Sequence, residues 1–368
     1  MDNYLKNSIG FDENDTNPPK PVGKRYDAAT ALKMLTRWPL GELMGLAHRA
    51  RMNRLPRNQV TFVVDTNPNY TNICVTGCRF CAFFKPPGVK DGYTLTPAEV
   101  AKRVSWAADQ GATTVLLQGG HNPDIDLSDW KAYIQAILKV CPKIHIHPFS
   151  PAEVVFMAKK EALSVYDVLK TIYDLGITTL PGGGAEILTD RVRTSIAPAK
   201  ATSKEWLETN ALAHKIGFKT TATLMYGHVE RDRDIIAHLF KLRDLQDQTH
   251  GFTSFIAWSF KPGNTALASK VPKSVHPAKY VRLIATARLV LDNFQHIQSS
   301  WFSESLAAGQ LGLLAGADDF GGVLVEENVL QTAGHHRSTT IADVKTMIAR
   351  TGFTPAQRDS TYRILKTF

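Results

Sequence analysis

The chain is poor in cysteine and has no long hydrophobic run. Four cysteines among 368 residues are too few for the disulfide framework of a small secreted domain, which indicates a reducing compartment. No apolar stretch is long enough to cross a bilayer, and the first residues lack the basic-then-apolar order of a secretory signal. We therefore expect a cytoplasmic protein without a membrane span.

The chain also lacks any concentrated block of positive charge. Lysine and arginine exceed aspartate and glutamate by nine, 43 against 34, an excess that suits nucleic acid, an anionic small substrate or an acidic electron-carrier protein. The basic residues are nevertheless spread along the chain, as in 231–243. This pattern favours a solvated surface, so we expect no nucleic-acid partner.

Three of the four cysteines lie within one short segment, at Cys74, Cys78 and Cys81. A four-iron cluster usually takes four thiolates, so three of them leave one iron with an open coordination position. The spacing, with three and then two intervening residues, differs from the paired spacing of many zinc sites. Phe80 directly precedes the last cysteine, where it could exclude water. The segment predicts a 4Fe-4S cluster, with a zinc knuckle in a nucleic-acid-binding protein as the alternative.

Three segments are expected along the chain. Residues 1–25 are polar and rich in proline, which predicts a loosely ordered arm. In 26–58, leucines at helical spacing interrupted by Pro39 predict two helices. From 59 to 368, β-branched runs alternate with longer amphipathic stretches, the pattern of repeated strand–helix units. The predicted strands are 60–64, 113–117, 144–147, 178–180, 220–224 and 253–258, with two weaker ones at 297–301 and 311–314.

These units predict an α/β fold, a (β/α)8 TIM-type barrel with an N-terminal helical extension and a C-terminal extension. An open wound sheet is the alternative for so many parallel strands. We favour the barrel because polar or glycine-rich clusters follow almost every strand, as at 118–121, 181–186 and 318–322, and barrel enzymes assemble their sites at that face. The cysteine segment follows the first strand and would lie at the same face.

A three-cysteine loop of this spacing, after the first strand of a repeated β/α chain, resembles the radical S-adenosylmethionine (SAM) superfamily. Within it, segments from about residue 30 to the C-terminus are similar to the dehypoxanthine futalosine cyclases. The glycine segment and the Gly-His-Val-Glu segment favour this family over aminofutalosine synthases and deazaflavin-cofactor synthases. Asp65-Thr-Asn-Pro68 and Arg231-Asp-Arg233 depart slightly from the family's pattern. The similar segments are Asn69-Tyr-Thr-Asn72, Gln118-Gly-Gly120, Phe149-Ser-Pro-Ala-Glu153, Pro181-Gly-Gly-Gly-Ala-Glu-Ile-Leu188, Met225-Tyr-Gly-His-Val-Glu230 and Glu326-Glu-Asn328.

The resemblance implies a 4Fe-4S cluster, S-adenosyl-L-methionine and a role in menaquinone biosynthesis by the futalosine pathway. In that superfamily the methionine moiety chelates the open iron, and an electron splits off a 5′-deoxyadenosyl radical. In the cyclases the radical takes hydrogen from the ribose 4′ carbon of dehypoxanthine futalosine, and the new carbon radical adds to the benzoate ring. The implied partners are a nucleoside substrate and a low-potential electron donor protein such as flavodoxin or ferredoxin.

The expected site residues fall in the clusters that follow the strands. Gln118, Gly119 and Gly120 resemble the segment that bonds the methionine amino group, although glycines also serve tight turns. Ser150 is expected to contact a ligand, or to cap the next helix together with Glu153. The other cofactor-binding candidates are Phe80, Glu186 and Arg193; the substrate-binding candidates are Asn72, Gly183, Gly184 and Tyr226; and the catalytic candidates are His228, as acceptor of the ring proton, with Asp319 and Glu326.

Overall fold

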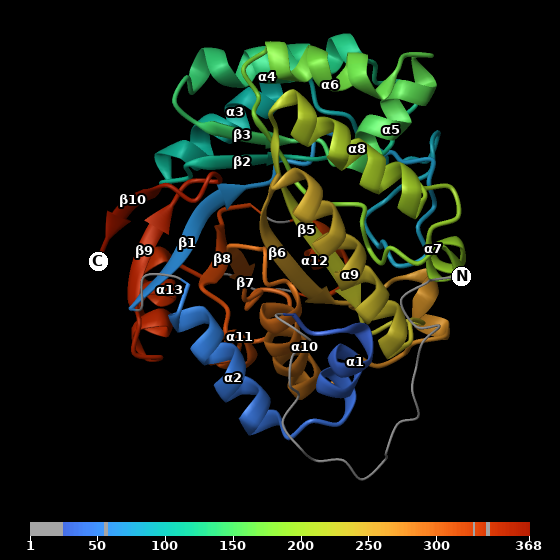
Figure 1. Cartoon of the computed structure of the whole chain (residues 1–368). Coiled ribbons are helices and arrows are strands. Elements are labelled where there is room, and N and C mark those ends of the chain that lie inside the picture. The colour runs from blue at the N-terminus through green and yellow to red at the C-terminus, as the bar shows by residue number, and fades with distance from the viewer. Residues whose placement is uncertain (1–24, 55–57, 327, 336–338) are drawn as a thin grey trace.

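The computed structural model describes residues 25–54, 58–326, 328–335 and 339–368 (Figure 1). Eight parallel strands form a nearly closed barrel, which confirms the predicted fold. The strands are β1 (Gln59–Thr66), β2 (Thr114–Leu117), β3 (His145–Pro148), β4 (Thr179–Leu180), β5 (Lys219–Tyr226), β6 (Phe252–Ser259), β7 (His296–Gln298) and β8 (Asp319–Leu324). Of the expected polar arm, only Arg25 is described.

Helices surround the strands in Figure 1, with α3 to α6 and α8 over β2 to β4, and α9 and α10 beside β5 to β7. They follow the strands along the chain in the alternation that the sequence predicts. The helices are α3 (Pro97–Asp109), α4 (Leu127–Val140), α5 (Pro151–Lys160), α6 (Val165–Asp174), α7 (Asp190–Ile196), α8 (Ser203–Ile216), α9 (Asp232–Thr249), α10 (Pro277–Val290), α11 (Leu306–Leu314), α12 (Val329–Thr332) and α13 (Ile341–Ala349).

Two helices precede the first strand, as predicted. α1 (Ala28–Thr36) and α2 (Leu40–Met52) are separated by Pro39, which stands at the start of α2. Arg282 of α10 donates a hydrogen bond of 2.5 Å to the Trp38 carbonyl. This bond ties the connection between the two helices to the outer layer of the barrel.

The barrel is closed by hydrogen-bonded strands except at one seam. The ladder runs from β3 through β2, β1, β8, β7, β6 and β5 to β4. In the described part of the chain β3 and β4 share no ladder. Instead, His145 Nε2 and His147 Nδ1 contact the Thr179 hydroxyl at 2.7 and 2.8 Å. Side chains therefore close the barrel where the backbone does not.

The predicted strand at 311–314 is wrong, because these residues end helix α11. The helix begins where the Ser305 hydroxyl accepts a hydrogen bond from the Ala308 amide at 3.0 Å. A short apolar run fits either a strand or a helix, and here the cap and the alanines that follow it favour the helix. The eighth strand is β8, which its glycines concealed because glycine weakens strand propensity.

A β-bulge in β8 decides which of its residues face the barrel interior. Thr61 of β1 pairs with Asp319, but Val63 pairs with Gly322, so β8 carries one extra residue. Gly321 has a φ of 77°, a conformation that glycine adopts at no steric cost. The bulge brings Gly322 to the interior.

The last two strands form a hairpin against β1. β9 (Thr354–Arg358) runs parallel to the first half of β1, and β10 (Ile364–Thr367) is antiparallel to β9. β2 pairs with β1 only at Asp65 and Thr66, which leaves the first half of β1 to β9. The hairpin thereby brings Arg358 to the interior of the barrel.

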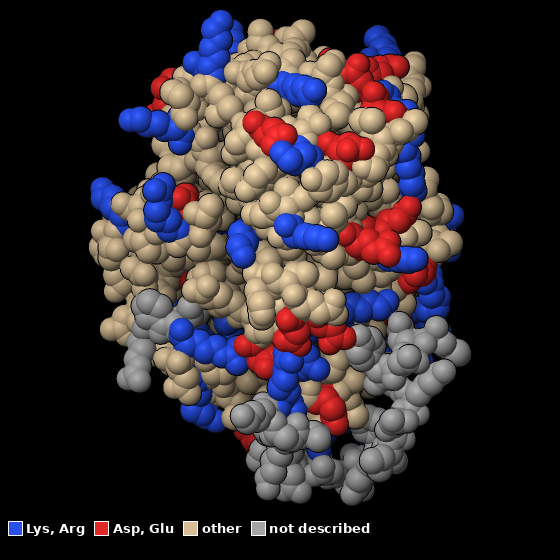
Figure 2. Space-filling view, turned by 45° about the horizontal axis from the view of Figure 1, so that its top comes forward, with Lys and Arg blue, Asp and Glu red and all other residues tan. Residues whose placement is uncertain are grey.

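Charges of both signs are mixed on the face that Figure 2 presents. This mixture agrees with the expected spread of basic residues over a solvated surface. Within the described ranges, no helix combines the length and the apolar character that a membrane crossing requires.

Candidate active site

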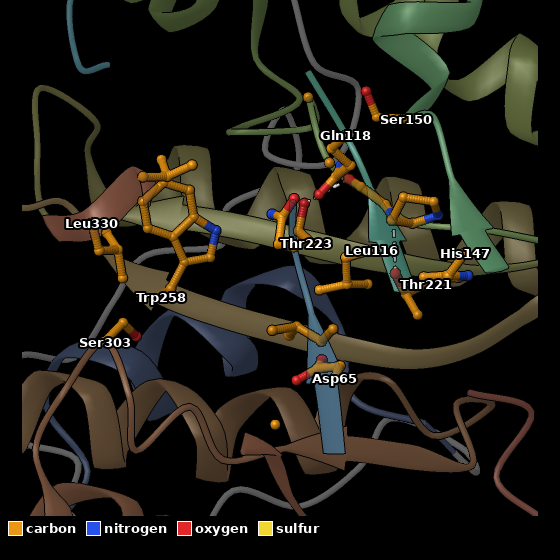
Figure 3. Close-up of a pocket in the computed structure, with 18 of the residues that line it drawn as sticks. Asp65, Leu116, Gln118, His147, Ser150, Thr221, Thr223, Trp258, Ser303 and Leu330 are labelled. Carbon is orange, nitrogen blue, oxygen red and sulfur yellow. Dashed lines mark hydrogen bonds between the residues drawn. The ribbon is translucent and has the colours of Figure 1, made fainter. Parts of the chain in front are cut away.

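A cavity of about 510 Å³ lies inside the barrel, beside the cysteine loop. Side chains of a strand point alternately to its two faces, and Val63 and Asp65 are the residues of β1 that face this cavity. Figure 3 shows Asp65 across the cavity from Gln118 and Ser150, with Trp258 of β6 on another side. The interior of the barrel is therefore hollow and open to a ligand.

The cavity has two ends that differ in construction. The loop end is lined by residues from the loops that follow the strands: Cys74, Cys78, Phe80, Cys81, Gly119, Gly120, Ser150, Gly183, Glu186 and Lys200. The strand end is lined by residues of the strands themselves and of the segment that follows β9: Asp65, Thr114, His147, Ser254, Arg358, Ser360 and Tyr362.

One short loop presents three thiols to the loop end. The Thr76 hydroxyl lies 3.0 Å from Cys74 Sγ and 3.4 Å from Cys78 Sγ. The Cys81 amide donates to the Cys78 carbonyl at 3.0 Å, so these two residues share a tight turn. Gly77, which separates Thr76 from Cys78, adopts a φ of 56°. The arrangement holds all three thiols on one wall of the cavity.

The chemistry of these thiols fits a multi-iron cluster. Burial raises the pKa of Cys81 to about 11, so a bound metal would be needed to keep this thiolate at neutral pH. A structural zinc site takes four protein ligands, whereas a four-iron cluster held by three thiolates keeps one iron open for a ligand. The loop offers three thiols to the cavity. The loop therefore suits the cluster better than a zinc knuckle.

Gly119 and Gly120 let the loop after β2 pack closely on the cysteine loop. A Cβ on Gly120 would lie 2.1 Å from the Ile73 carbonyl oxygen, and one on Gly119 would lie 2.6 Å from the Tyr70 ring. Neither position has room for a side chain. The Gly119 amide donates to the Glu153 carboxylate at 3.1 Å. Both glycines serve tight packing and also line the cavity, where their backbone can meet a ligand.

Ser150 caps α5 and also lines the cavity. The Glu153 carboxylate accepts hydrogen bonds from the amide and the hydroxyl of Ser150, both at 2.7 Å. Burial raises the pKa of Glu153, although these bonds oppose the shift. Ser150 therefore caps α5, as one of the two alternatives predicted, and its contact with a ligand stays a prediction.

Glu186 and Lys200 form a buried ion pair at the loop end. Lys200 Nζ lies 2.8 Å from Glu186 Oε1 and 5.6 Å from the centre of the Phe80 ring. Burial alone would lower the pKa of Lys200, but the charge of Glu186 raises it. Arg193 does not line the cavity; its guanidinium donates to the Gly184 carbonyl at 3.1 Å and holds the glycine loop from behind. Its predicted role in cofactor binding has no support in this placement.

Three of the four substrate-binding candidates line the cavity, namely Asn72, Gly183 and Gly184. Both ends of the Asn72 amide group are already bonded to the backbone of its own loop. Tyr226 lies outside the lining: its hydroxyl is 3.3 Å from Glu304 Oε2, and burial raises its pKa. The two glycines are therefore the best placed of the four to meet a substrate.

The three catalytic candidates lie outside the lining that the described residues define. The ring Nε2 of His228 contacts a backbone carbonyl at 3.1 Å, and burial lowers the pKa of this histidine. Asp319 accepts a 2.9 Å bond from Arg358, and Glu326 accepts a 3.0 Å bond from Arg103. Each group is engaged with the protein itself, so the placement does not favour a catalytic role for any of them.

The strand end was missed by the sequence reasoning. Asp65 lies one residue beyond the predicted strand at 60–64, yet it belongs to β1 and is only 6% exposed. A carboxylate at the end of an apolar β-branched run was the available signal. Arg358 and Tyr362 gave no such signal, because the hairpin that carries them follows the eight strand–helix units.

Two family models match the chain in succession. Residues 68–242 match the radical SAM superfamily, and residues 249–367 match the CofH/MqnC C-terminal region. The cyclic dehypoxanthine futalosine synthase of Halalkalibacterium halodurans is 37% identical over 94% of this chain and 93% of its own length. The 5-amino-6-(D-ribitylamino)uracil--L-tyrosine 4-hydroxyphenyl transferase of Methanopyrus kandleri is also 37% identical, over 89% of this chain and 90% of its own length.

The crystal structure of methylornithine synthase (PylB) has the same fold, with a TM-score of 0.71 at 17% identity over 91% of this chain and 95% of that one. The barrel, the three-cysteine loop and the first family model define a radical SAM enzyme. Within that superfamily, the chain belongs to the group that carries the CofH/MqnC C-terminal region. The family implies a 4Fe-4S cluster and SAM as cofactors.

Proposed function

We propose that this enzyme cyclises dehypoxanthine futalosine, the reaction for which its Halalkalibacterium halodurans relative is named. The observation that carries the proposal is that one continuous cavity reaches from the three cysteines to the strand end. A radical generated at the loop end would meet a substrate held in the same cavity. A shared cavity matters because a reactive carbon radical must reach its substrate before it enters competing reactions.

The loop end offers groups for both cofactors. Cys74, Cys78 and Cys81 would hold the cluster, and the backbone at Gly120 would bind the methionine amino group. When bound, cluster and SAM supply the 5′-deoxyadenosyl radical that takes hydrogen from the substrate. Glu186, held by its ion pair, would accept bonds from the ribose hydroxyls of SAM. The electron would come from a low-potential donor protein such as flavodoxin or ferredoxin.

The strand end would hold the substrate. Hydroxyl groups of Thr114 and Ser254 face this space, together with the ring of Trp258 higher on β6. An aromatic ring beside hydroxyl groups suits a nucleoside with an attached benzoate, because one part of such a ligand stacks and the other forms hydrogen bonds. Gly183 and Gly184 line the cavity, where their backbone would come close to this substrate.

The test is an anaerobic assay of the reconstituted holoenzyme with SAM, a reductant and dehypoxanthine futalosine. We expect 5′-deoxyadenosine together with a product lighter than the substrate by two hydrogens, detected by mass spectrometry. A matched reaction without SAM should give neither compound. Deoxyadenosine without the lighter product would reject the cyclase assignment while leaving the radical SAM class intact.

A 4-hydroxyphenyl transferase is the second candidate, because the Methanopyrus kandleri relative is equally identical. An amino-acid substrate needs a partner for its ammonium group, and the Asp65 carboxylate faces the cavity. The same holoenzyme supplied with tyrosine and 5-amino-6-(D-ribitylamino)uracil separates the two candidates. A coupled product from this pair, and none from dehypoxanthine futalosine, would favour the transferase.

A further inference from the structure

Asp65 places a buried carboxylate at the strand end of the cavity. Its side chain is 6% exposed, and its Oδ1 atom has no hydrogen-bond partner among the described residues. Figure 3 shows its side chain on β1, among the residues that line the cavity. Buried polar groups are usually satisfied, so a carboxylate that lines a cavity with one oxygen unsatisfied indicates a role toward a ligand.

The neighbouring strand leaves room for this carboxylate. A Cβ on Gly322 of β8 would lie 2.4 Å from Asp65 Oδ1, so only glycine fits at that position. The bulge at Gly321 is what turns this glycine toward β1. Gly322 therefore leaves the room that the Asp65 carboxylate occupies, and Oδ1 receives no hydrogen bond there from any residue that the structure describes.

Asp319, the buried aspartate of β8, pairs with the positive charge of Arg358. Asp319 accepts bonds from Arg358 at 2.9 Å, from the Thr61 hydroxyl at 2.6 Å and from the Gly321 amide at 2.9 Å. The guanidinium of Arg358 is thereby neutralised by Asp319, and no bond from it reaches Asp65. Asp319 therefore holds the hairpin, whereas Asp65 faces the cavity.

Asp65 is also the one group of the strand end, as the described residues define it, that changes charge near neutrality. Burial raises the pKa of Asp65 to about 7; the charge of Arg358 opposes this shift and that of Asp319 adds to it. Burial lowers the pKa of His147 to about 3 and raises that of Tyr362. Both of these neighbours are therefore neutral at pH 7, where Asp65 can exchange a proton.

We propose that Asp65 is the catalytic base that accepts the proton lost when the cyclised ring regains aromaticity, an inference that rests on the proposed cyclase function. Before this step, the bond between the ribose 4′ carbon and the ring has formed. The ring C–H bond then breaks, its proton passes to the Asp65 carboxylate and its electron pair stays in the ring. The ring passes one electron to a one-electron oxidant of the iron–sulfur class.

The test compares wild type and D65N as reconstituted holoenzymes in a single anaerobic turnover with SAM and dehypoxanthine futalosine. We expect the variant to form 5′-deoxyadenosine as wild type does, because hydrogen abstraction precedes the proton loss. Its cyclised product should fall by about 10²- to 10⁴-fold, the usual contribution of a general base. A substrate-derived organic radical should accumulate in the variant and be visible by electron paramagnetic resonance.

The pH dependence adds a readout that a structural role would not move. Wild-type product formation should rise with pH and level off above about 7, and D65N should lose this rise. H147N is the matched variant: whatever its rate, the pH midpoint should stay near that of wild type.

Three outcomes would overturn the inference. If D65N forms product with the wild-type pH dependence, Asp65 is not the base although the enzyme is a cyclase. If deoxyadenosine and product fall together, the residue acts before the proton transfer. If wild type itself forms no cyclised product, the proposed function fails and the role of Asp65 in it fails as well.

Discussion

The two ends of the cavity differ in how their residues are distributed along the sequence. At the loop end, most functional groups belong to short segments with visible spacing, such as the three cysteines or the pair Ser150 and Glu153; Lys200 is an exception. At the strand end, the groups come one at a time from separate elements, with Asp65 from β1 and Arg358 from the terminal hairpin. Chemistry that depends on local spacing can be recognised in a sequence, whereas chemistry that the barrel assembles cannot.

The largest effect is expected from a substitution that disables the loop end and leaves the strand end intact. C78A should lose iron and sulfide completely and form no 5′-deoxyadenosine, because two thiolates cannot hold the cluster. The strand end does not depend on this loop, so circular dichroism should still report the folded barrel. Metal and sulfide analysis after anaerobic reconstitution measures the result.

C141A is the matched control, since Cys141 lies at the end of α4 and is not part of the cavity lining. It should keep the full iron and sulfide content. A wild-type protein with one zinc and no sulfide, or equal loss in both variants, would contradict the cluster at the loop end.

Most of the barrel was predictable because hydrophobic periodicity is a local property. The alternation of strand and helix located seven of the eight barrel strands, with ends that differ by a few residues. β8 escaped because its function requires glycines: Gly321 forms the bulge and Gly322 makes room for Asp65. The apolar run at 311–314 took its place in the prediction, although that run is the end of a helix.

The sequence predicted the site residues that lie in one short segment. It did not predict which residues from distant segments the fold brings together. Asp319 was chosen as a catalytic candidate because an acidic residue near a strand end fits the barrel rule. Its bonds to Arg358 depend on how the β9–β10 hairpin packs against β1, which no local sequence pattern predicts. Asp65, the carboxylate that does face the cavity, follows the predicted first strand, but no sequence pattern assigned it a chemical role.

D319N tests whether the two aspartates really differ. Removing this carboxylate charge leaves the buried guanidinium of Arg358 without its ion-pair partner. Breaking a buried pair in this way typically costs about 3–5 kcal/mol, so the unfolding free energy measured with urea should fall by that amount. A loss of less than about 1 kcal/mol, the range of an exposed pair, would mean that Asp319 does not hold the hairpin.

D65N should change stability in the opposite direction, and only at higher pH. The folded-state pKa of about 7 exceeds the value of about 3.9 in unfolded chains, so the folded wild type keeps a proton that the unfolded chain releases. Wild type therefore loses stability relative to D65N as the pH rises from 4 to 7. The gap should be near zero at pH 4 and reach about 4 kcal/mol at pH 8.

Urea denaturation of both proteins at the two pH values measures this gap. The experiment needs neither cofactor nor substrate, so it reports on the carboxylate independently of the proposed reaction. A gap that is the same at pH 4 and pH 8 would show that Asp65 does not titrate between them.

The smallest expected effect tests whether Ser150 only caps α5 or also contacts the cofactor at the loop end. S150A removes a helix cap and should lower the unfolding free energy by about 1 kcal/mol. S164A removes the corresponding cap of α6, where the Ser164 hydroxyl accepts a bond from the Asp167 amide at 3.1 Å on an exposed surface. If Ser150 only caps α5, the two variants lose similar stability and bind SAM equally well by calorimetry. If it also contacts the cofactor, SAM affinity falls in S150A alone, and a polar residue at the loop end then serves both the fold and the ligand.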